Sequence, residues 1–315
     1  MKRIITCLLT ALLLASCGQT YEEKKRISRQ QRLQLLREDS AALKVAVLPT
    51  LDCLPLYVAH ESQLFQKLGA DVRLKRYTAQ MDCDTALEHG RVEVMVSDLV
   101  RTERLIDQGT PMAYLTATDA YWQLLTNRAT RIRQLKGLDD KMIAMTRYSV
   151  TDLLADLATD SAGLKSERVF KVQVNDVHVR LRMLQNNEMD AMLLTEPQAT
   201  EARLSHHRVL LDTRQLNLRM GVLAARKQTV GDSTRQQQLE ALRKGYNMAC
   251  DSIAKKGIGH YRDLIAKYCG IKGEQADSLP ATLRFQHYNE PRQQDIDRAR
   301  QWLTQTMRTL SATRK

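Results

Sequence analysis

Several residue patterns that mark common enzyme classes are missing from this 315-residue sequence. It has no G-x-S-x-G nucleophile motif, no H-E-x-x-H zinc motif, no phosphate-binding loop and no dinucleotide-binding glycine motif. Its seven histidines are scattered, and no Cys-x-x-Cys or His-x-x-x-His pair supplies the spacing of a metal site. We therefore expect no catalytic centre, no cofactor and no bound metal.

Aromatic side chains are also scarce, at 5% of the sequence. The formal net charge of +12 is spread along the chain, because arginine and lysine are interleaved with glutamate, aspartate and glutamine. This pattern lacks the aromatic-studded basic face of many nucleic-acid-binding proteins, so we expect no nucleic acid partner. The densest basic region, residues 292–315, is interpreted as a solvated helix face, with contact to anionic lipid as the alternative.

One long apolar run stands at the N-terminus, in the segment MKRIITCLLTALLLASC of residues 1–17. A Lys-Arg start, an apolar stretch over residues 4–15 and small residues before Cys17 form the layout of an export signal. The stretch is too short for a good transmembrane span. Leu14-Ala15-Ser16-Cys17 resembles the bacterial lipobox, which implies cleavage before Cys17, lipidation of that cysteine and a place on the extracytoplasmic side of a membrane in the cell envelope. An ordinary signal with an incidental cysteine is the alternative.

Residues 18–43 are dominated by Glu, Lys, Arg and Gln. We interpret them as a polar tether between lipid anchor and globular body, partly helical where Leu33 and Leu36 can pack. A solvated first helix of the domain is the alternative.

Residues 44–100 alternate strand-like and helix-like patterns, β-α-β-α-β, with turn residues between them. The first strand ends before Pro49, the helical spacing of Tyr57 to Leu68 ends on Gly69, and a second helix, capped by Asp82, ends on Gly90. Val92 to Val96 is a near-continuous apolar run, as in a strand covered on both faces. This order predicts an α/β fold, with ligands at the carboxyl ends of its strands.

These residues resemble the periplasmic solute-binding proteins of the nitrate, sulfonate, taurine and thiamine-precursor importer group. The resemblance covers most of residues 44–225, although Ser62-Gln63 stand where the family usually has glycine. It rests on short segments: Pro-Leu-Tyr-Val-Ala at 55–59, Leu64-Phe65, Gly69-Ala-Asp-Val72, Ala86-Leu87, Gly90, Val92-Glu-Val and Glu196-Pro197.

The resemblance implies a two-lobed, type II-like periplasmic binding protein in which each lobe is a mostly parallel sheet with helices on both faces. It also implies a monomer that delivers a small molecule to the permease and ATPase subunits of an ABC importer. An enzyme of the same fold that acts on a cofactor precursor and a ligand-sensing module are the alternatives.

A short internal sequence repeat supports the prediction of two lobes. Residues 87–96 align without gaps on residues 184–193 and place Gly90 opposite Asn187, the two residue types that best end a helix in the left-handed conformation. We predict a first lobe over residues 44–118, a second over 119–218, and a return to the first lobe over 219–315.

Four cysteines remain after the signal: Cys53, Cys83, Cys250 and Cys269. Two disulfides and four buried thiols are both compatible with an exported protein.

A ligand cleft would draw on the loops at the strand ends. Helix N-termini point into this space and favour an anionic group. We expect contributions from residues 50–55, 57, 78–82, 97–98, 118, 119, 121, 147–151 and 195–196. Several carboxylates there would suit a heteroaromatic, thiamine-precursor-like ligand with donor nitrogens, while a sulfonate- or taurine-like anion is the other hypothesis. Arg147 could hold an acid group or pair with Asp52 or Asp98 across the cleft. The predicted ligand-binding residues are Asp52, Leu54, Tyr57, Asp82, Ser97, Asp98, Asp119, Tyr121, Arg147, Tyr148, Ser149, Thr151 and Glu196.

Overall fold

The computed structural model describes residues 21–280 and 282–313, so the predicted signal and Cys17 lie outside the described residues. The chain divides into two compact units, residues 1–42 and residues 43–315. In the first unit, the predicted tether contains one helix, α2 (Tyr21–Ala41), on which Leu33 and Leu36 are exposed. None of the helices in the described ranges is apolar over enough length to cross a membrane.

The second unit begins with a sheet in the order β2-β1-β3-β10-β4. β1, β2 and β3 are parallel, and β10 runs antiparallel to both β3 and β4. The intervening helices return the chain to the same edge each time, so β1, β2 and β3 end together at one edge of the sheet. The bounds are β1 (Leu43–Val47), β2 (Val72–Arg76), β3 (Val94–Asp98), β4 (Met112–Ala117) and β10 (Gly221–Arg226).

A second sheet repeats this plan in the order β7-β6-β8-β5-β9. β6, β7 and β8 are parallel, and β5 is antiparallel to both β8 and β9. The chain passes from the first sheet to the second through residues 118–121 and comes back through residues 213–220. The bounds are β5 (Trp122–Thr126), β6 (Lys141–Met145), β7 (Val169–Gln173), β8 (Ala191–Thr195) and β9 (Arg208–Asp212).

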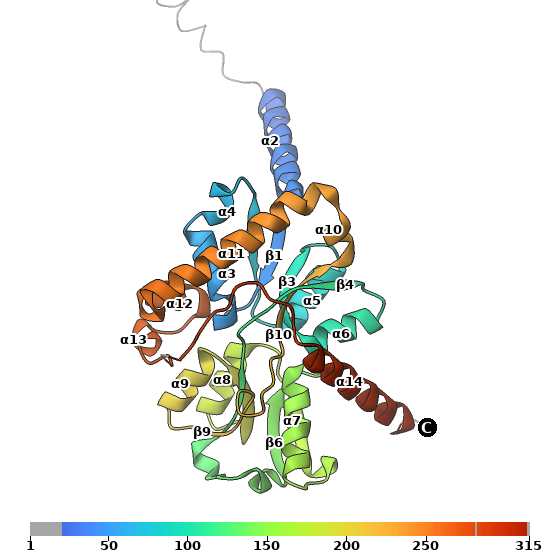
Figure 1. The fold of residues 1–315 in the computed structure, drawn as a ribbon, viewed down its shortest axis with the longest axis vertical. Coiled ribbons are helices and arrows are strands. Elements are labelled where there is room, and N and C mark those ends of the chain that lie inside the picture. The colour runs from blue at the N-terminus through green and yellow to red at the C-terminus, as the bar shows by residue number, and fades with distance from the viewer. Residues whose placement is uncertain (1–20, 281, 314–315) are drawn as a thin grey trace, which may run out of the picture. The chain divides into compact units, whose positions relative to one another are not determined.

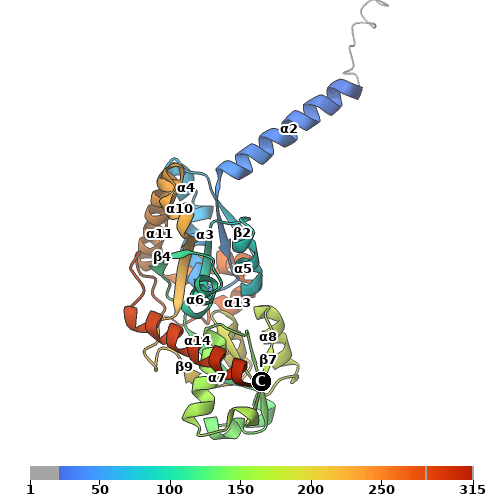
Figure 2. The same ribbon diagram turned by 90° about the vertical axis from the view of Figure 1, so that its right-hand side faces the viewer.

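Helices cover both faces of each sheet, which confirms the predicted α/β class with two lobes. Figure 2 shows α11 and α5 on opposite sides of the first sheet. α7 and α8 connect the parallel strands of the second sheet (Figure 1). The bounds are α3 (Leu54–Glu61), α4 (Leu64–Lys67), α5 (Gln80–Glu88), α6 (Leu99–Asp107), α7 (Val150–Ser161), α8 (Val177–Gln185), α9 (Gln198–Leu204), α10 (Lys227–Gly231), α11 (Gln236–Lys256), α12 (Arg262–Cys269), α13 (Gly273–Ala276) and α14 (Gln293–Thr313).

The internal sequence repeat is confirmed in the backbone. α5 and α8 occupy equivalent places in the two lobes, and each is followed by a left-handed residue, Gly90 at φ +66° and Asn187 at φ +62°. A buried strand follows in both lobes, β3 in the first and β8 in the second.

Two predicted helices differ in detail. The segment from Tyr57 to Leu68 is not one helix, because Gln63 adopts φ +55° between α3 and α4. This is a left-handed conformation, which glycine adopts without strain. Asp82 does not cap its helix either: α5 begins two residues earlier, at Gln80, and Asp82 is an exposed residue of the first turn.

The structure distinguishes between two disulfides and four buried thiols. Cys53, Cys83, Cys250 and Cys269 are all free and buried, so the two-disulfide alternative is wrong. The thiols pack within the apolar core, where Cys53 Sγ accepts a hydrogen bond from Leu48 N–H and Cys250 Sγ donates one to the carbonyl of Gln286.

The C-terminal helix α14 contacts both lobes, drawn in dark red in Figures 1 and 2. Arg300 forms an ion pair with the buried Glu103 of α6, with Nε and Oε2 2.7 Å apart. Trp302 Nε1–H donates a 3.1 Å hydrogen bond to Asp156 of α7. α14 thus links a first-lobe helix to a second-lobe helix.

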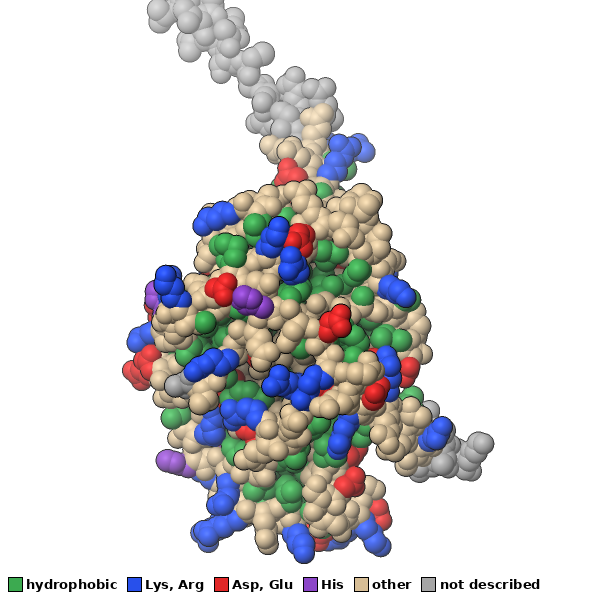
Figure 3. All heavy atoms as spheres, in the orientation of Figure 1, with side chains coloured by type: hydrophobic (Ala, Val, Ile, Leu, Met, Phe, Trp, Pro, Cys, Tyr) green, Lys and Arg blue, Asp and Glu red, His purple; other side chains and the backbone are tan. Residues whose placement is uncertain are grey.

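Charged side chains are dispersed on the face shown in Figure 3. Lys and Arg lie singly or in small groups among Asp, Glu and apolar side chains, and they do not form one continuous stripe. On this face the charge distribution is that of a solvated surface.

Candidate functional site

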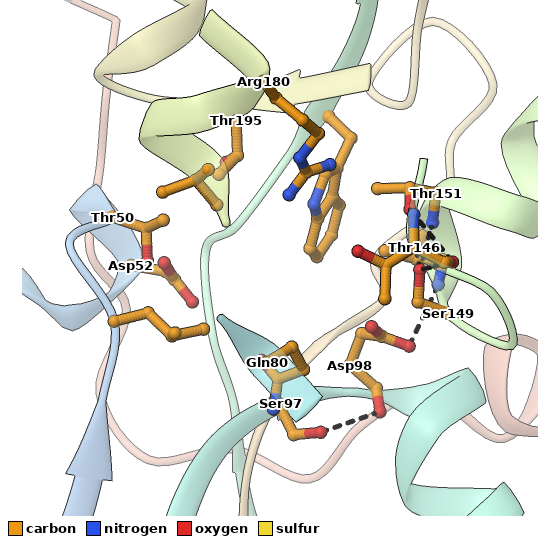
Figure 4. Close-up of a pocket in the computed structure, with 14 residues that line it drawn as sticks. Thr50, Asp52, Gln80, Ser97, Asp98, Thr146, Ser149, Thr151, Arg180 and Thr195 are labelled. Atoms are coloured by element: carbon orange, nitrogen blue, oxygen red, sulfur yellow. Dashed lines mark hydrogen bonds between the residues drawn. The ribbon is translucent and has the colours of Figure 1, made fainter. Parts of the chain in front are cut away.

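A polar cavity of about 50 Å³ lies between the two lobes, at the carboxyl ends of their strands. Figure 4 shows polar side chains converging on it from both lobes. Parallel strands of the two sheets end toward it, which places their following loops and helix N-termini around one space. The lining residues are Leu48, Thr50, Asp52, Gln80, Ser97, Asp98, Trp122, Thr146, Ser149, Val150, Thr151, Val177, Arg180 and Thr195.

Direct hydrogen bonds hold the lobes together around this cavity. Leu51 N–H donates to the carbonyl of Glu196 at 2.8 Å, and the Gln198 side chain donates to the carbonyl of Pro49 at 2.7 Å. Arg101, from the first lobe, donates to the carbonyl of Arg147 in the second at 3.1 Å. The structure is therefore a closed arrangement of the lobes.

The first lobe supplies two acidic side chains. Asp98 ends β3 and caps α6, and its Oδ1 accepts from Arg101 N–H at 3.0 Å and, across the cleft, from Val150 N–H at 3.1 Å. Burial raises the pKa of Asp98 to about 7. Asp52, in the single turn before α3, accepts a long bond of 3.4 Å from the Thr118 hydroxyl, and burial raises its pKa as well.

Three hydroxyl groups of the second lobe lie at the start of α7. Ser149 caps the helix by accepting from Thr151 N–H at 3.1 Å, and its hydroxyl donates to the carbonyl of Thr146 at 2.7 Å. Thr151 Oγ1 accepts from Thr146 N–H at 2.9 Å. These bonds fix the turn and leave the hydroxyls at the wall of the cavity (Figure 4).

The second lobe also supplies the cation of the cavity, Arg180 of α8. Its side chain reaches toward the open centre in Figure 4, Nη1 donates to the carbonyl of Leu193 at 2.8 Å, and the buried Nε–H has no partner within the described residues. Burial lowers the pKa of Arg180 to about 10, which still leaves it charged at neutral pH. A buried guanidinium with an unused donor is suited to an acceptor supplied by a ligand.

Five of the predicted residues line the cavity together: Asp52, Ser97, Asp98, Ser149 and Thr151.

The other predicted residues lie elsewhere. Leu54 and Tyr57 are buried in α3, with the Tyr57 ring stacked on Tyr268 at 4.1 Å between centroids. Asp82 is exposed, and the buried carboxylate of that helix is Asp84, whose ion pair with Arg101 was not predicted.

Arg147 is exposed, and within the described ranges it forms no ion pair with Asp52 or Asp98. Tyr148 is half-buried, and the guanidinium of Arg104 lies over its ring. Arg147 and Tyr148 belong to the tight turn before α7, in which Tyr148 has φ +54°. Neither residue lines the cavity.

Asp119, Tyr121 and Glu196 lie outside the interlobe cavity and contact other residues. Asp119 and Tyr121 line a separate cavity of about 300 Å³ beside the interlobe linkers. Glu196 is buried and accepts from the Tyr121 hydroxyl at 2.7 Å and from Arg203 at 2.6 Å. Its carboxylate is therefore occupied by side chains of its own lobe.

Sequence reasoning missed Trp122, Thr146, Val177, Leu48 and, most importantly for charge, Arg180. A signal for Arg180 was present, because it falls among Val177, Leu181 and Leu184 on the apolar stripe of α8. An arginine on a buried helix face needs a partner, so this position is a candidate for binding a ligand.

The fold is that of a two-lobed α/β protein with a polar cavity between its lobes. A model of the NMT1/THI5 like family matches residues 50–252, so the chain belongs to this family. No curated protein matches the sequence.

Solved structures share the fold. The alkanesulfonate-binding protein SsuA from Xanthomonas axonopodis pv. citri, bound to MOPS, has a TM-score of 0.72 at 14% identity, over 85% of this chain and 93% of that chain. The periplasmic aliphatic sulphonate binding protein SsuA from Escherichia coli has a TM-score of 0.69 at 17% identity, over 82% and 84%. The periplasmic nitrate-binding protein NrtA from Synechocystis PCC 6803 has a TM-score of 0.66 at 14% identity, over 79% and 74%. The predicted resemblance to periplasmic solute-binding proteins is confirmed at the level of family and fold.

Proposed function

We propose that this chain is a lipid-anchored, extracytoplasmic solute-binding protein that delivers one small molecule to an ABC importer. Membership of the NMT1/THI5 like family and a fold shared with SsuA and NrtA support this proposal. The Leu14 to Cys17 segment supports the anchor. The importer's permease and ATPase would be its partners, and it would act as a monomer.

The observation that carries the proposal is the polar cavity between two lobes that are joined by short linkers. Residues 118–121 and 213–220 are the strand-to-strand crossings, and hydrogen bonds between the lobes surround the cavity. Rotation about two such linkers opens and closes a cleft, so a solute can enter and then be shielded from water. Capture and release is the chemistry that this arrangement performs best.

Two classes of solute fit the cavity walls. Arg180 favours an anionic group of the sulfonate or taurine kind. Trp122 offers a ring face, and Asp52 offers an acceptor for the donor nitrogens of a thiamine-precursor-like heteroaromatic compound.

Binding without turnover is tested with the purified protein. It is incubated with a small-molecule extract of the cells that make it, washed, and denatured, and released compounds are identified by mass spectrometry. We expect one compound in near-stoichiometric amount, recovered unchanged after prolonged incubation. A product that accumulates beyond one equivalent would instead establish an enzyme.

Delivery to an importer is tested by uptake of the retained compound in cells with and without this protein. We expect uptake of the radiolabelled compound to be lost on deletion and restored by the gene. If a pre-made permease still transports the compound in the deletion strain while gene expression changes, the protein is a sensor.

The anchor is tested by Cys17→Ala, with Cys7→Ala as the matched control within the same segment. We expect the Cys17 variant to leave the membrane fraction and the Cys7 variant to remain there. Identical fractionation of both variants would refute lipid anchoring through Cys17.

A further inference from the structure

The interlobe cavity has a basic side chain on one lobe and carboxyl groups on the other. Arg180 extends from α8 of the second lobe, whereas Asp52 and Asp98 extend from the first lobe (Figure 4). All three side chains are more than 90% buried. Buried charges are normally paired, since removing an ion from water costs several kcal/mol, on the order of the whole stability of a domain, unless a partner offsets it.

Arg180 is not paired in this way. None of the ion pairs formed among residues 21–280 and 282–313 includes it, its Nε–H is buried without a partner, and its one hydrogen bond in these ranges goes to a backbone carbonyl. The acid that most favours its charge, Asp176, caps the same helix and is engaged by His178 and Val179 N–H groups. The guanidinium therefore presents donors to the cavity that a bound acid group would satisfy.

Asp98 and Asp52 differ in the hydrogen bonds that their carboxyl groups accept. Asp98 Oδ1 accepts backbone N–H groups from both lobes, so that carboxylate acts in closure. Asp52 accepts from the Thr50 hydroxyl, from its own backbone N–H and, at 3.4 Å, from the Thr118 hydroxyl; it takes no part in a bond to the second lobe within the described residues and lies in the wall of the cavity. Asp52 is the acceptor that a donor group on a ligand would reach.

We infer that the solute is a small molecule with an acid group at one end and an amine or other N–H donor at the other. Its acid group binds Arg180 of the second lobe, and its donor binds Asp52 of the first. The inference rests on the proposed function and specifies its substrate class. A bare anion would offer no donor to Asp52, and a heteroaromatic base without an acid group would leave the Nε–H of Arg180 without an acceptor.

The same contacts couple binding to closure. An acid group on Arg180 and a donor on Asp52 tie opposite lobes to one molecule, so each end of the solute is fully bound only in the closed arrangement. The cavity of about 50 Å³ admits only a compact solute in this arrangement.

The experiment compares Arg180→Met, Asp52→Asn and Arg182→Met with the original protein. Arg182 lies on the same helix and is exposed, so it is the matched control. Each protein is exposed to the cell extract, the retained compound is identified by mass spectrometry, and its affinity is measured by calorimetry. We expect a compound that contains both an acid group and an N–H donor, bound about tenfold to hundredfold more weakly by Arg180→Met and by Asp52→Asn, and unchanged by Arg182→Met.

Thermal unfolding without ligand separates recognition from folding. Arg180→Met removes an unpaired buried charge, so we expect its unliganded Tm to be equal to or above that of the original protein while its ligand-induced rise in Tm is lost. A retained compound without an acid group, or undiminished affinity in Arg180→Met, would overturn the inference and leave the proposed function standing. If no compound is retained by the original protein, both fail.

Discussion

Asp98 and Val150 join the two lobes directly, because Asp98 Oδ1 at the end of β3 accepts a 3.1 Å hydrogen bond from the first N–H group of α7. The same oxygen accepts from Arg101 N–H at 3.0 Å. One carboxylate thus lies at the N-termini of two helices, one from each lobe, where helix dipoles favour negative charge. It occupies a position that an anion would otherwise suit.

The titration of Asp98 should lower the free energy of unfolding as the pH rises from 4 to 8. Burial raises its pKa from 3.8 to about 7, so between these values the folded protein holds a proton that the unfolded chain releases. The free energy of unfolding then decreases as pH rises through this window, by at most about 1.4 kcal/mol per pH unit. Asp98→Asn keeps an acceptor oxygen but cannot titrate. Urea unfolding from pH 4 to pH 8 should show the original protein losing stability relative to Asp98→Asn, and parallel profiles would contradict this.

The ion pair between Asp84 and Arg101 should be costly to break. Both side chains are nearly inaccessible, with 7% and 2% exposed, and Arg101 also reaches the second lobe. Arg101→Met leaves a buried carboxylate unpaired, so we expect about 3–5 kcal/mol of destabilisation in urea unfolding. The double variant with Asp84→Leu should recover part of this loss. Arg243→Met, which removes a fully exposed pair with Glu240, should cause no measurable change.

Arg300 should anchor α14 more strongly than its neighbour Arg298. Glu103 is only 3% exposed and accepts from Arg300 and from the Tyr114 hydroxyl, whereas Arg298 is exposed one half-turn earlier on α14. Arg300→Gln should lower the free energy of unfolding by about 2 kcal/mol. Arg298→Gln should stay within about 0.5 kcal/mol of the original protein. Equal effects of the two substitutions in urea unfolding would show that the Glu103 pair contributes little.

Gly221 should be needed at the return crossing. A Cβ there would lie 2.3 Å from the Thr118 hydroxyl oxygen and 2.7 Å from Ala120 Cβ, in the opposite linker. Gly221→Ala forces these linkers apart, so we expect a loss of about 1–3 kcal/mol in chemical unfolding. Gly231→Ala is the control, since a Cβ there meets nothing within 4 Å. If Gly221→Ala left the free energy of unfolding unchanged, the linkers would be able to move apart without a measurable cost.

The four thiols should be unreactive in the native protein. Cys53, Cys83, Cys250 and Cys269 are buried, and burial raises the pKa of each, to about 12 for Cys250. Thiolate is the reactive form, so these four thiols should show negligible labelling with Ellman's reagent at pH 8 in buffer and complete labelling in urea. Reductant should not alter the Tm. A drop in Tm with reductant would indicate a disulfide.

Local patterns determined much of the fold. Apolar alternation, helical spacing and Gly90 or Asn187 at helix ends depend on a few neighbouring residues, so both lobes could be predicted from them. Asp52, Ser97, Asp98, Ser149 and Thr151 could also be predicted at the cavity wall, because residues that follow parallel strands meet at one edge whatever the rest of the chain does.

Tertiary packing decided the rest. Arg180 reaches the cavity from the middle of a helix, and its role depends on which face of α8 packs against the second sheet. The strand ends predict Glu196 and Tyr121 at the cavity, yet the Glu196 carboxylate is bound by Arg203 of the following helix and by the Tyr121 hydroxyl, and neither residue lines the cavity. The cysteines remain thiols because each sulfur faces the core. These outcomes depend on contacts between residues distant in the chain, which no local pattern specifies.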